Sequence, residues 1–112
     1  MGAAMVIRSE VLDKIGLFDE RFFVWFEEID LCKRAHQAGF RIRYFPDAQI
    51  IHHGGSSFNK SKVFYKQLIF NNSLIKYFFK HKPIWQLLVI LFIVPINLFL
   101  TFLYVIFIYD KE

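Results

Sequence analysis

Apolar residues are distributed unevenly along this chain and are densest near its C-terminal end. From Ile84 to Tyr109 no residue carries a formal charge, and most are Leu, Ile, Phe or Val. A helix over these 26 residues would be about 39 Å long, at about 1.5 Å per residue, against a hydrocarbon core of about 30 Å. A chain this small could not enclose a helix that is apolar all round. The pattern therefore predicts a transmembrane helix over residues 83–109, followed by a tail at 110–112.

The residues before this span combine an apolar side with positive charge. Residues 60–82 repeat large apolar side chains at helical spacing and carry several lysines, which predicts a basic amphipathic helix. Such a helix suits a membrane interface, although a helix that simply packs over the preceding domain has the same pattern. Lys80, His81 and Lys82 outweigh the charge of the short tail. This predicts a single-pass protein of the cell inner or plasma membrane, with its N-terminal domain in the cytoplasm.

The first 59 residues mix charged and apolar positions in the proportions of a globular domain. Two helices, each followed by a glycine, are predicted over residues 10–15 and 27–38. Alternating apolar positions predict strands over residues 40–45 and 49–52. Helices combined with strands in this order predict an α/β fold for this part of the chain.

Composition and charge fit a membrane protein better than a nucleic-acid-binding one. The chain is 55% hydrophobic and 20% aromatic, its net charge is +4, and its lysines gather between Lys60 and Lys82. A basic segment beside an apolar span is typical of attraction to anionic membrane lipid, and we expect no nucleic-acid partner. Cys32 is the only cysteine, so an intrachain disulfide or a cysteine-based zinc cluster is excluded.

Three carboxylates crowd the start of the second predicted helix: Glu27, Glu28 and Asp30. The helix dipole stabilises negative charge at a helix N-terminus, so all three could be capping charges alone. Capping needs only one or two acids, however, and an aromatic run that ends in Trp25 and Phe26 leads straight into them. A carboxylate beside an apolar wall is partly desolvated and becomes a stronger base, as general-base catalysis requires. The sequence contains the residue types that such a site needs, but it does not show how they are arranged in space.

A histidine pair follows the second predicted strand. In a strand, His52 and His53 point to opposite faces, so at most one of them faces a given site. A neutral imidazole ligates Mn²⁺-like metals, particularly beside carboxylates, although two polar residues at a strand end are the plainer interpretation. The segment 54–57, Gly-Gly-Ser-Ser, could present backbone N–H groups to a phosphate or form a simple turn.

Taken in order, these motifs resemble the C-terminal, acceptor-side half of the family 2 glycosyltransferases, closest to the rhamnosyltransferase-like branch that builds polysaccharides. The resemblance implies a partial A-type glycosyltransferase fold over residues 1–59, a nucleotide-sugar donor, a glycan acceptor and inversion at the anomeric carbon. It also implies a divalent metal, Mn or Mg, which we expect only in the complete enzyme. The matching segments are 2–8, 16–23, 27–34, 39–40, 46–48, 52–57 and 80–81.

The same resemblance implies roles for single residues. Glu28 occupies the position of the general base that deprotonates the acceptor hydroxyl. His52 occupies the position that can approach the metal. The other implied residues would orient the base and the acceptor or line the acceptor wall. They are Glu27, Asp30, Trp25 and Phe26.

Two departures from the family pattern bear on function. Glu28 stands where members more often have Asp, and a displacement of about 1 Å can change a rate on the order of a hundredfold. The donor-binding strands and the Asp-x-Asp metal motif have no counterpart before Gly2. We therefore expect the chain to be inactive alone, with an N-terminal half that another chain could supply.

Two functions follow as expectations. The first is the acceptor side of a membrane-anchored inverting glycosyltransferase that extends a polysaccharide or a lipid-linked glycan. The alternative is a small bitopic membrane protein that acts as a non-enzymatic interaction partner. Binding of a nucleotide sugar separates them, because an interaction partner needs none.

Overall fold

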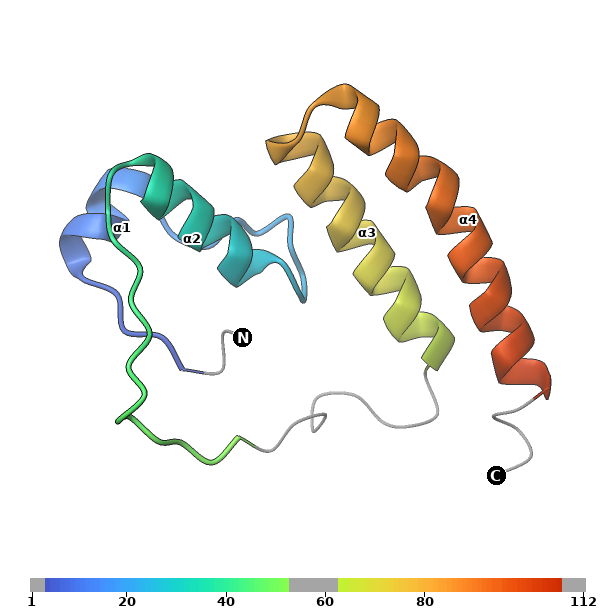
Figure 1. Cartoon of the computed structure of the whole chain (residues 1–112), viewed down its shortest axis with the longest axis horizontal. Coiled ribbons are helices and arrows are strands. Elements are labelled where there is room, and N and C mark those ends of the chain that lie inside the picture. The colour runs from blue at the N-terminus through green and yellow to red at the C-terminus, as the bar shows by residue number, and fades with distance from the viewer. Residues whose placement is uncertain (1–3, 53–62, 108–112) are drawn as a thin grey trace. The chain divides into compact units, whose positions relative to one another are not determined.

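The computed structural model describes residues 4–52 and 63–107, which contain four α-helices (Figure 1). By its contacts the chain divides into two units, Met1–Gly54 and Gly55–Glu112. The first unit holds α1 (Ser9–Ile15) and α2 (Glu27–Gln37). The second unit holds α3 (Val63–His81) and α4 (Ile84–Phe107).

Glycines in the left-handed region end both helices of the first unit. Gly16 has φ 77° directly after α1, and Gly39 has φ 90° just beyond α2. A side chain at this φ would crowd its own backbone, so glycine ends each helix at low cost. The helices predicted over residues 10–15 and 27–38 are confirmed, with bounds that differ by one residue.

A small apolar core lies between α1 and α2, which pack on each other. Leu31 and Ala35 are both buried and lie about one turn apart, so the face of α2 that they share is the covered one. Lys14 adds a polar contact from α1: its Nζ donates to the Ala38 carbonyl at 3.0 Å and lies 5.3 Å from the centre of the Phe40 ring. The buried apolar side chains of this core are Val11, Phe22, Leu31 and Ala35.

A buried ion pair joins α2 to the end of α1. The Asp30 side chain has no exposed surface, and its Oδ2 accepts a 2.8 Å hydrogen bond from Nε of Arg34, one turn later. The two terminal nitrogens of Arg34 donate to the carbonyls of Ile15 and Leu17, the second at 2.7 Å. One guanidinium therefore satisfies a buried carboxylate and two carbonyls, with a fork geometry that lysine lacks.

The predicted α/β fold is wrong, because the described residues contain no strand and no sheet. Residues 40–45 and 49–52, predicted as strands, belong to an irregular segment that leads away from α2 (Figure 1). Alternating apolar residues decide which side of a strand is buried, but the hydrogen-bond ladder needs a neighbouring strand. The described part of the chain supplies none, and Tyr44 and Ile51 are each 88% exposed. These residues alone therefore do not form the expected partial A-type glycosyltransferase sheet.

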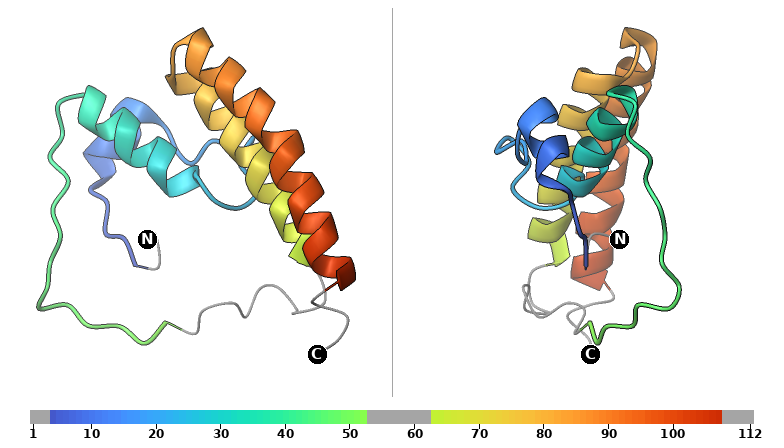
Figure 2. Two further views of the ribbon diagram at one scale, coloured as in Figure 1. Left: turned by 45° about the vertical axis from the view of Figure 1, so that its right-hand side comes forward. Right: turned by 90° about the vertical axis from the view of Figure 1, so that its left-hand side faces the viewer.

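The second unit is an antiparallel hairpin of α3 and α4 (Figures 1 and 2). The Lys82 N–H donates to the Phe78 carbonyl at the end of α3. Pro83 precedes α4, where its missing N–H costs no helical hydrogen bond. The helices predicted over residues 60–82 and 83–109 are thus present within the described residues, while their interfacial and transmembrane locations stay predictions.

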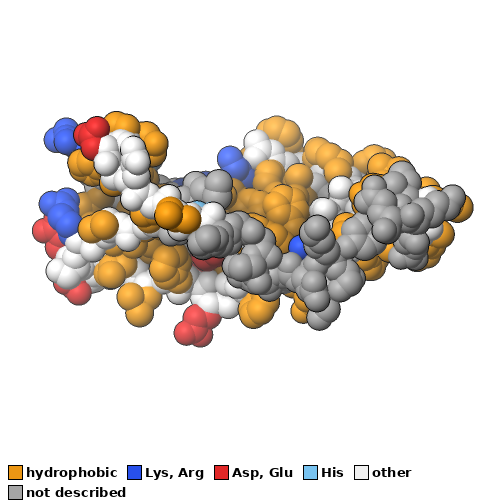
Figure 3. Space-filling view, turned by 90° about the horizontal axis from the view of Figure 1, so that it is seen from below, with side chains coloured by type: hydrophobic (Ala, Val, Ile, Leu, Met, Phe, Trp, Pro, Cys, Tyr) orange, Lys and Arg blue, Asp and Glu red, His pale blue; other side chains and the backbone are white. Residues whose placement is uncertain are grey.

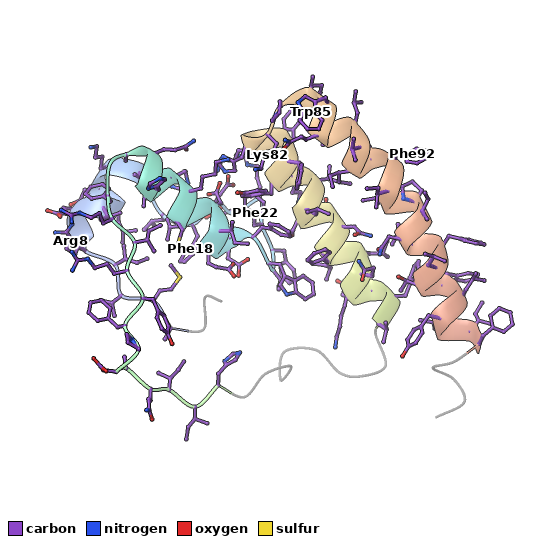
Figure 4. The ribbon with its side chains drawn as sticks, in the orientation of Figure 1. Arg8, Phe18, Phe22, Lys82, Trp85 and Phe92 are labelled. Carbon is purple, nitrogen blue, oxygen red and sulfur yellow. The ribbon has the colours of Figure 1, made fainter. Side chains whose placement is uncertain are left out.

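α4 is the one helix in residues 4–52 and 63–107 that is long and apolar enough to cross a membrane. Only 6% of its most apolar window is buried among the described residues. The space-filling view of Figure 3 shows hydrophobic side chains over much of the visible face, and Phe92 of α4 is among those that point outward in Figure 4. The surface of α4 is therefore apolar on most sides.

Three amide side chains form a polar clasp at mid-length between the helices of the hairpin: Gln67, Asn71 and Asn97. Nδ2 of Asn71 on α3 donates to Oδ1 of Asn97 on α4 at 3.1 Å, and Oδ1 of Asn71 accepts from Nε2 of Gln67 at 3.2 Å. Asn71 is 4% exposed. Nearer the open end, the rings of Phe64 and Phe102 meet edge to face with their centroids 6.3 Å apart. The two helices are thus held together over much of their length.

We predict that Arg34→Lys loosens the packing of α2 on α1. Lysine keeps the charge but cannot reach all three acceptors, so buried oxygens lose their donors. We expect a loss of about 2 kcal/mol in local stability, measured by hydrogen–deuterium exchange as roughly thirtyfold faster amide exchange in α2. Gln37→Lys, an exposed change on the same helix, is the matched control. Equal exchange in the two variants would contradict the role given to Arg34.

Candidate functional site

The loop that leads into α2 is held by a turn of its own. The Asp19 carboxylate accepts hydrogen bonds from Nε and Nη2 of Arg21 at 2.9 and 2.6 Å, and its Oδ1 accepts the Arg21 backbone N–H at 3.1 Å. The Phe22 N–H donates to the Asp19 carbonyl, and the Phe22 ring is buried. The hydrogen bond and the charge of Asp19 raise the pKa of Arg21 above its ordinary value, so the guanidinium stays charged.

Two consecutive aromatic residues, Trp25 and Phe26, adopt left-handed backbone conformations directly before α2. Their φ angles are 64° and 70°, and the Phe26 carbonyl accepts the Asp30 N–H at 2.8 Å as the first hydrogen bond of the helix. Bulky residues rarely adopt this region, and each such residue costs on the order of 1–3 kcal/mol. Strain of this kind concentrates at ligand sites, because the surrounding structure must hold it in place.

Glu27 and Glu28, the first residues of α2, each have a buried carboxylate oxygen without a partner. In both residues Oε2 is buried and has no hydrogen-bond partner among the described residues, although the side chains as a whole are half-buried. An unpaired buried acceptor costs about 1–3 kcal/mol. The helix dipole partly offsets this cost for a negative charge. The two oxygens can therefore accept a hydrogen bond from a bound hydroxyl, or a proton.

Asp30, the third acid of the predicted cluster, has a different environment. Its side chain has no exposed surface, and its carboxylate is ion-paired with Arg34. It therefore holds α2 in place through Arg34. The structure divides the three acids into two with an unpartnered oxygen and one that is fully engaged. The substrate-binding role of Asp30 stays a prediction.

His52 is exposed and lies at the end of the irregular segment that follows α2. Within the described residues no group of three His, Cys, Asp or Glu side chains could hold a metal ion. These residues alone do not fit the divalent metal that the family implies. The metal role of His52 stays a prediction, and His53 and residues 54–57 lie outside the described residues.

The sequence reasoning missed the two basic residues that hold the site in place. Arg34 had a signal, since Asp30 and Arg34 are spaced i and i+4 on one helix. Its two carbonyl partners on the far side of the loop cannot be read from that spacing. Lys14 contacts a carbonyl 24 positions away, for which the sequence holds no signal.

A family model described as "Glycosyltransferase like family 2" matches residues 1–67, which is more than half of the chain. The matched segment includes α1, α2, the two left-handed aromatic residues and all of the predicted site residues. The family predicted from the order of the motifs is confirmed. No solved structure matches the chain.

Three relatives illustrate the match. The chain is 36% identical over 56 residues to the N-acetylglucosaminyl-diphospho-decaprenol L-rhamnosyltransferase of Mycobacterium tuberculosis (strain CDC 1551 / Oshkosh), an alignment that covers 50% of this chain and 18% of that protein. It is 36% identical over 52 residues to rhamnosyltransferase WbbL of Escherichia coli (strain K12), covering 46% and 20%. It is 44% identical over 50 residues to the pre-mycofactocin glycosyltransferase of M. tuberculosis, covering 45% and 10%. The chain thus spans about a fifth or less of the length of these relatives.

We predict that this chain alone binds Mn²⁺ weakly, with a dissociation constant on the order of 1 mM or above. The reason is that no group of three ligating side chains includes His52 among the described residues. A Mn²⁺ titration followed by electron paramagnetic resonance of the free ion measures the affinity, and His52→Ala should leave it unchanged. Micromolar binding that His52→Ala abolishes would contradict this prediction.

Proposed function

Because this chain belongs to the glycosyltransferase-like family 2, we propose that it supplies the acceptor side of an inverting sugar transfer. In this reaction a nucleotide sugar donates its sugar to a hydroxyl of a polysaccharide or a lipid-linked glycan. The acceptor oxygen forms a bond to the anomeric carbon, the bond from that carbon to the diphosphate breaks, and the nucleoside diphosphate leaves. The hydroxyl proton passes to Glu28.

The observation that carries this proposal is the unpartnered Oε2 of Glu28. A general base must have a free acceptor oxygen within reach of the proton that it removes. Oε2 of Glu28 has no partner among the described residues, whereas the carboxylate of Asp30 is engaged by Arg34. Of the three acids, Asp30 is therefore the least suited to act as the base.

The neighbours of Glu28 take supporting roles in the proposal. Glu27 has the second unpartnered oxygen and would accept a hydrogen bond from another acceptor hydroxyl. Trp25 and Phe26 would form part of the wall on which the sugar packs, and their strained backbone fixes where that wall meets the acids. Asp30 contributes by holding the start of α2 through Arg34.

The relatives support the chemical class of the substrates. Two of them are rhamnosyltransferases, and the name of one places its acceptor on a diphospho-decaprenol lipid. Because this chain covers about a fifth or less of each, donor binding is proposed for a region outside these residues, on the same or another polypeptide. The divalent metal would bind only in the complete enzyme. His52 is the one residue of this chain that we propose as its ligand.

The proposed location is the cytoplasmic face of the cell inner or plasma membrane. α4 is a candidate membrane-binding element by its length and composition, and Lys80, His81 and Lys82 lie just before it. Positive charge beside an apolar helix favours the cytoplasmic side. A lipid-linked acceptor would then be presented on the same surface as the enzyme.

We predict that Glu28→Gln lowers sugar transfer by about 10²–10⁴-fold, the range expected when a general base is removed. The test uses a chimaera of E. coli WbbL in which these residues replace the segment that aligns with them. Transfer from a radiolabelled nucleotide sugar is measured in membranes. Glu28→Asp keeps a carboxylate at this position, so it should retain more activity than Glu28→Gln.

The control for this experiment is Glu20→Gln, which removes one negative charge from an exposed position on the loop before α2. It should leave transfer within about twofold of the unsubstituted chimaera. If Glu28→Gln kept near-normal turnover, the assignment of Glu28 as the base would be wrong. A chimaera that bound nucleotide sugar but transferred nothing would contradict the proposed acceptor-side function itself.

A further inference from the structure

The polar clasp constrains how the hairpin of α3 and α4 can meet a membrane. Asn97 lies near the middle of α4, between the apolar residues Ile96 and Leu98. Its amide oxygen accepts the hydrogen bond from Asn71 of α3. If α4 crossed a bilayer by itself, Asn97 would lie near the centre of the hydrocarbon, where no water replaces that bond. Bonds of this kind between membrane helices contribute about 0.6–2 kcal/mol.

α3 is poorly suited to cross the membrane beside α4. It carries Lys66, Lys76 and Lys80, and a charged side chain within a membrane-spanning helix is costly, most of all near the centre of the helix. Within the described residues only α4 has the length and composition of a span. An upright α4 must therefore either release α3 and lose the clasp, or carry lysines into the hydrocarbon.

The distribution of lysines around α3 points to a third arrangement. At about 100° per residue, Lys66, Lys76 and Lys80 lie roughly 140–180° around the helix from Asn71. Asn71 contacts α4, so the lysines lie on the side of α3 that is turned away from α4. The closed hairpin is thus amphipathic as a whole, with lysines along one side and the apolar α4 along the other.

The turn of the hairpin carries residues typical of a membrane interface. Lys82 and Trp85 both lie there (Figure 4), and Trp85 is 61% exposed. Tryptophan and lysine favour the headgroup level, where an amphipathic ring and a charge both remain hydrated. A turn at this level, together with a lysine side along α3, fits a hairpin that lies parallel to the surface.

We propose that α3 and α4 stay closed as one hairpin lying along the surface of a lipid membrane, with α4 in the acyl boundary and the lysines of α3 among the headgroups. This differs from the single crossing predicted from sequence, in which the two ends of α4 lie on opposite sides. In the surface arrangement the first unit and the end of α4 lie on the same side. The inference concerns membrane attachment and does not depend on sugar transfer.

The first test is topology in bacterial membranes. An epitope is appended after Glu112, and protease is added to right-side-out or to inverted membrane vesicles. We expect the epitope and the first unit to be cut together, in inverted vesicles only. Cutting of the epitope and of the first unit from opposite sides would overturn the proposal in favour of a single crossing.

The second test is whether the hairpin stays closed in lipid. In a Cys32→Ser background, Phe64→Cys with Phe102→Cys is treated with a short bis-thiosulfonate in phosphatidylethanolamine–phosphatidylglycerol vesicles. The control pair, Tyr65→Cys with Phe102→Cys, moves the first thiol about 100° around α3 to an exposed position. Linked tryptic peptides should be at least about tenfold more abundant for the first pair, and equal yields would overturn the proposal.

Two additions to the second test separate the remaining outcomes. Adding Asn97→Leu removes the amide oxygen that accepts the hydrogen bond from Asn71 and replaces it with an apolar side chain that is stable in lipid. This change should lower the cross-link yield severalfold. No change would show that the clasp does not hold the hairpin. Mixing ¹⁴N- and ¹⁵N-labelled protein identifies the chains that are joined, and links between two chains would assign the contact to a second copy instead.

Discussion

The position of the candidate site depends on the buried ion pair of Asp30 and Arg34. A carboxylate without exposed surface is tolerated only when charge and hydrogen bonds replace the lost water, and Arg34 provides both. The same guanidinium donates to the Ile15 carbonyl at the end of α1, where helices leave carbonyls without partners. The end of one helix and the start of the next are thereby fixed against each other.

The backbone strain at Trp25 and Phe26 is maintained because α1 and α2 are fixed against each other. A left-handed backbone at two bulky residues persists only if both ends of the segment are held. The turn of Asp19 and Arg21 with the buried Phe22 holds one end. The bond from the Asp30 N–H to Phe26, in a helix already tied down by Arg34, holds the other. The contacts of this loop, rather than those of its aromatic residues alone, therefore determine how Glu27 and Glu28 are presented.

The sequence predicted the structural features that depend on neighbouring residues. It failed to predict those that depend on contacts between residues distant in the sequence. The first two helices were predicted almost to the residue, because the glycines that end them act within one turn. The family and the location of the acids also followed from sequence. The different environment of Asp30 did not, because Arg34 is held against it by the carbonyls of Ile15 and Leu17, which are distant in sequence. The basic helix before α4 was likewise predicted from local sequence, whereas its amide contact with Asn97 was not.

The failed strand prediction and the unpartnered acids lead to one physical conclusion. Residues 40–45 and 49–52 were predicted as strands, yet Tyr44 and Ile51 are exposed, because a strand gains its hydrogen bonds only from a neighbour. Oε2 of Glu27 and Oε2 of Glu28 are likewise buried without a donor. Both features lie within the 67 residues that match the family, and neither can be satisfied by the described residues. In the proposed enzyme, the acceptor hydroxyl would donate a hydrogen bond to the unpartnered oxygens of the two glutamates. The active site would thus be completed by a group from outside these residues.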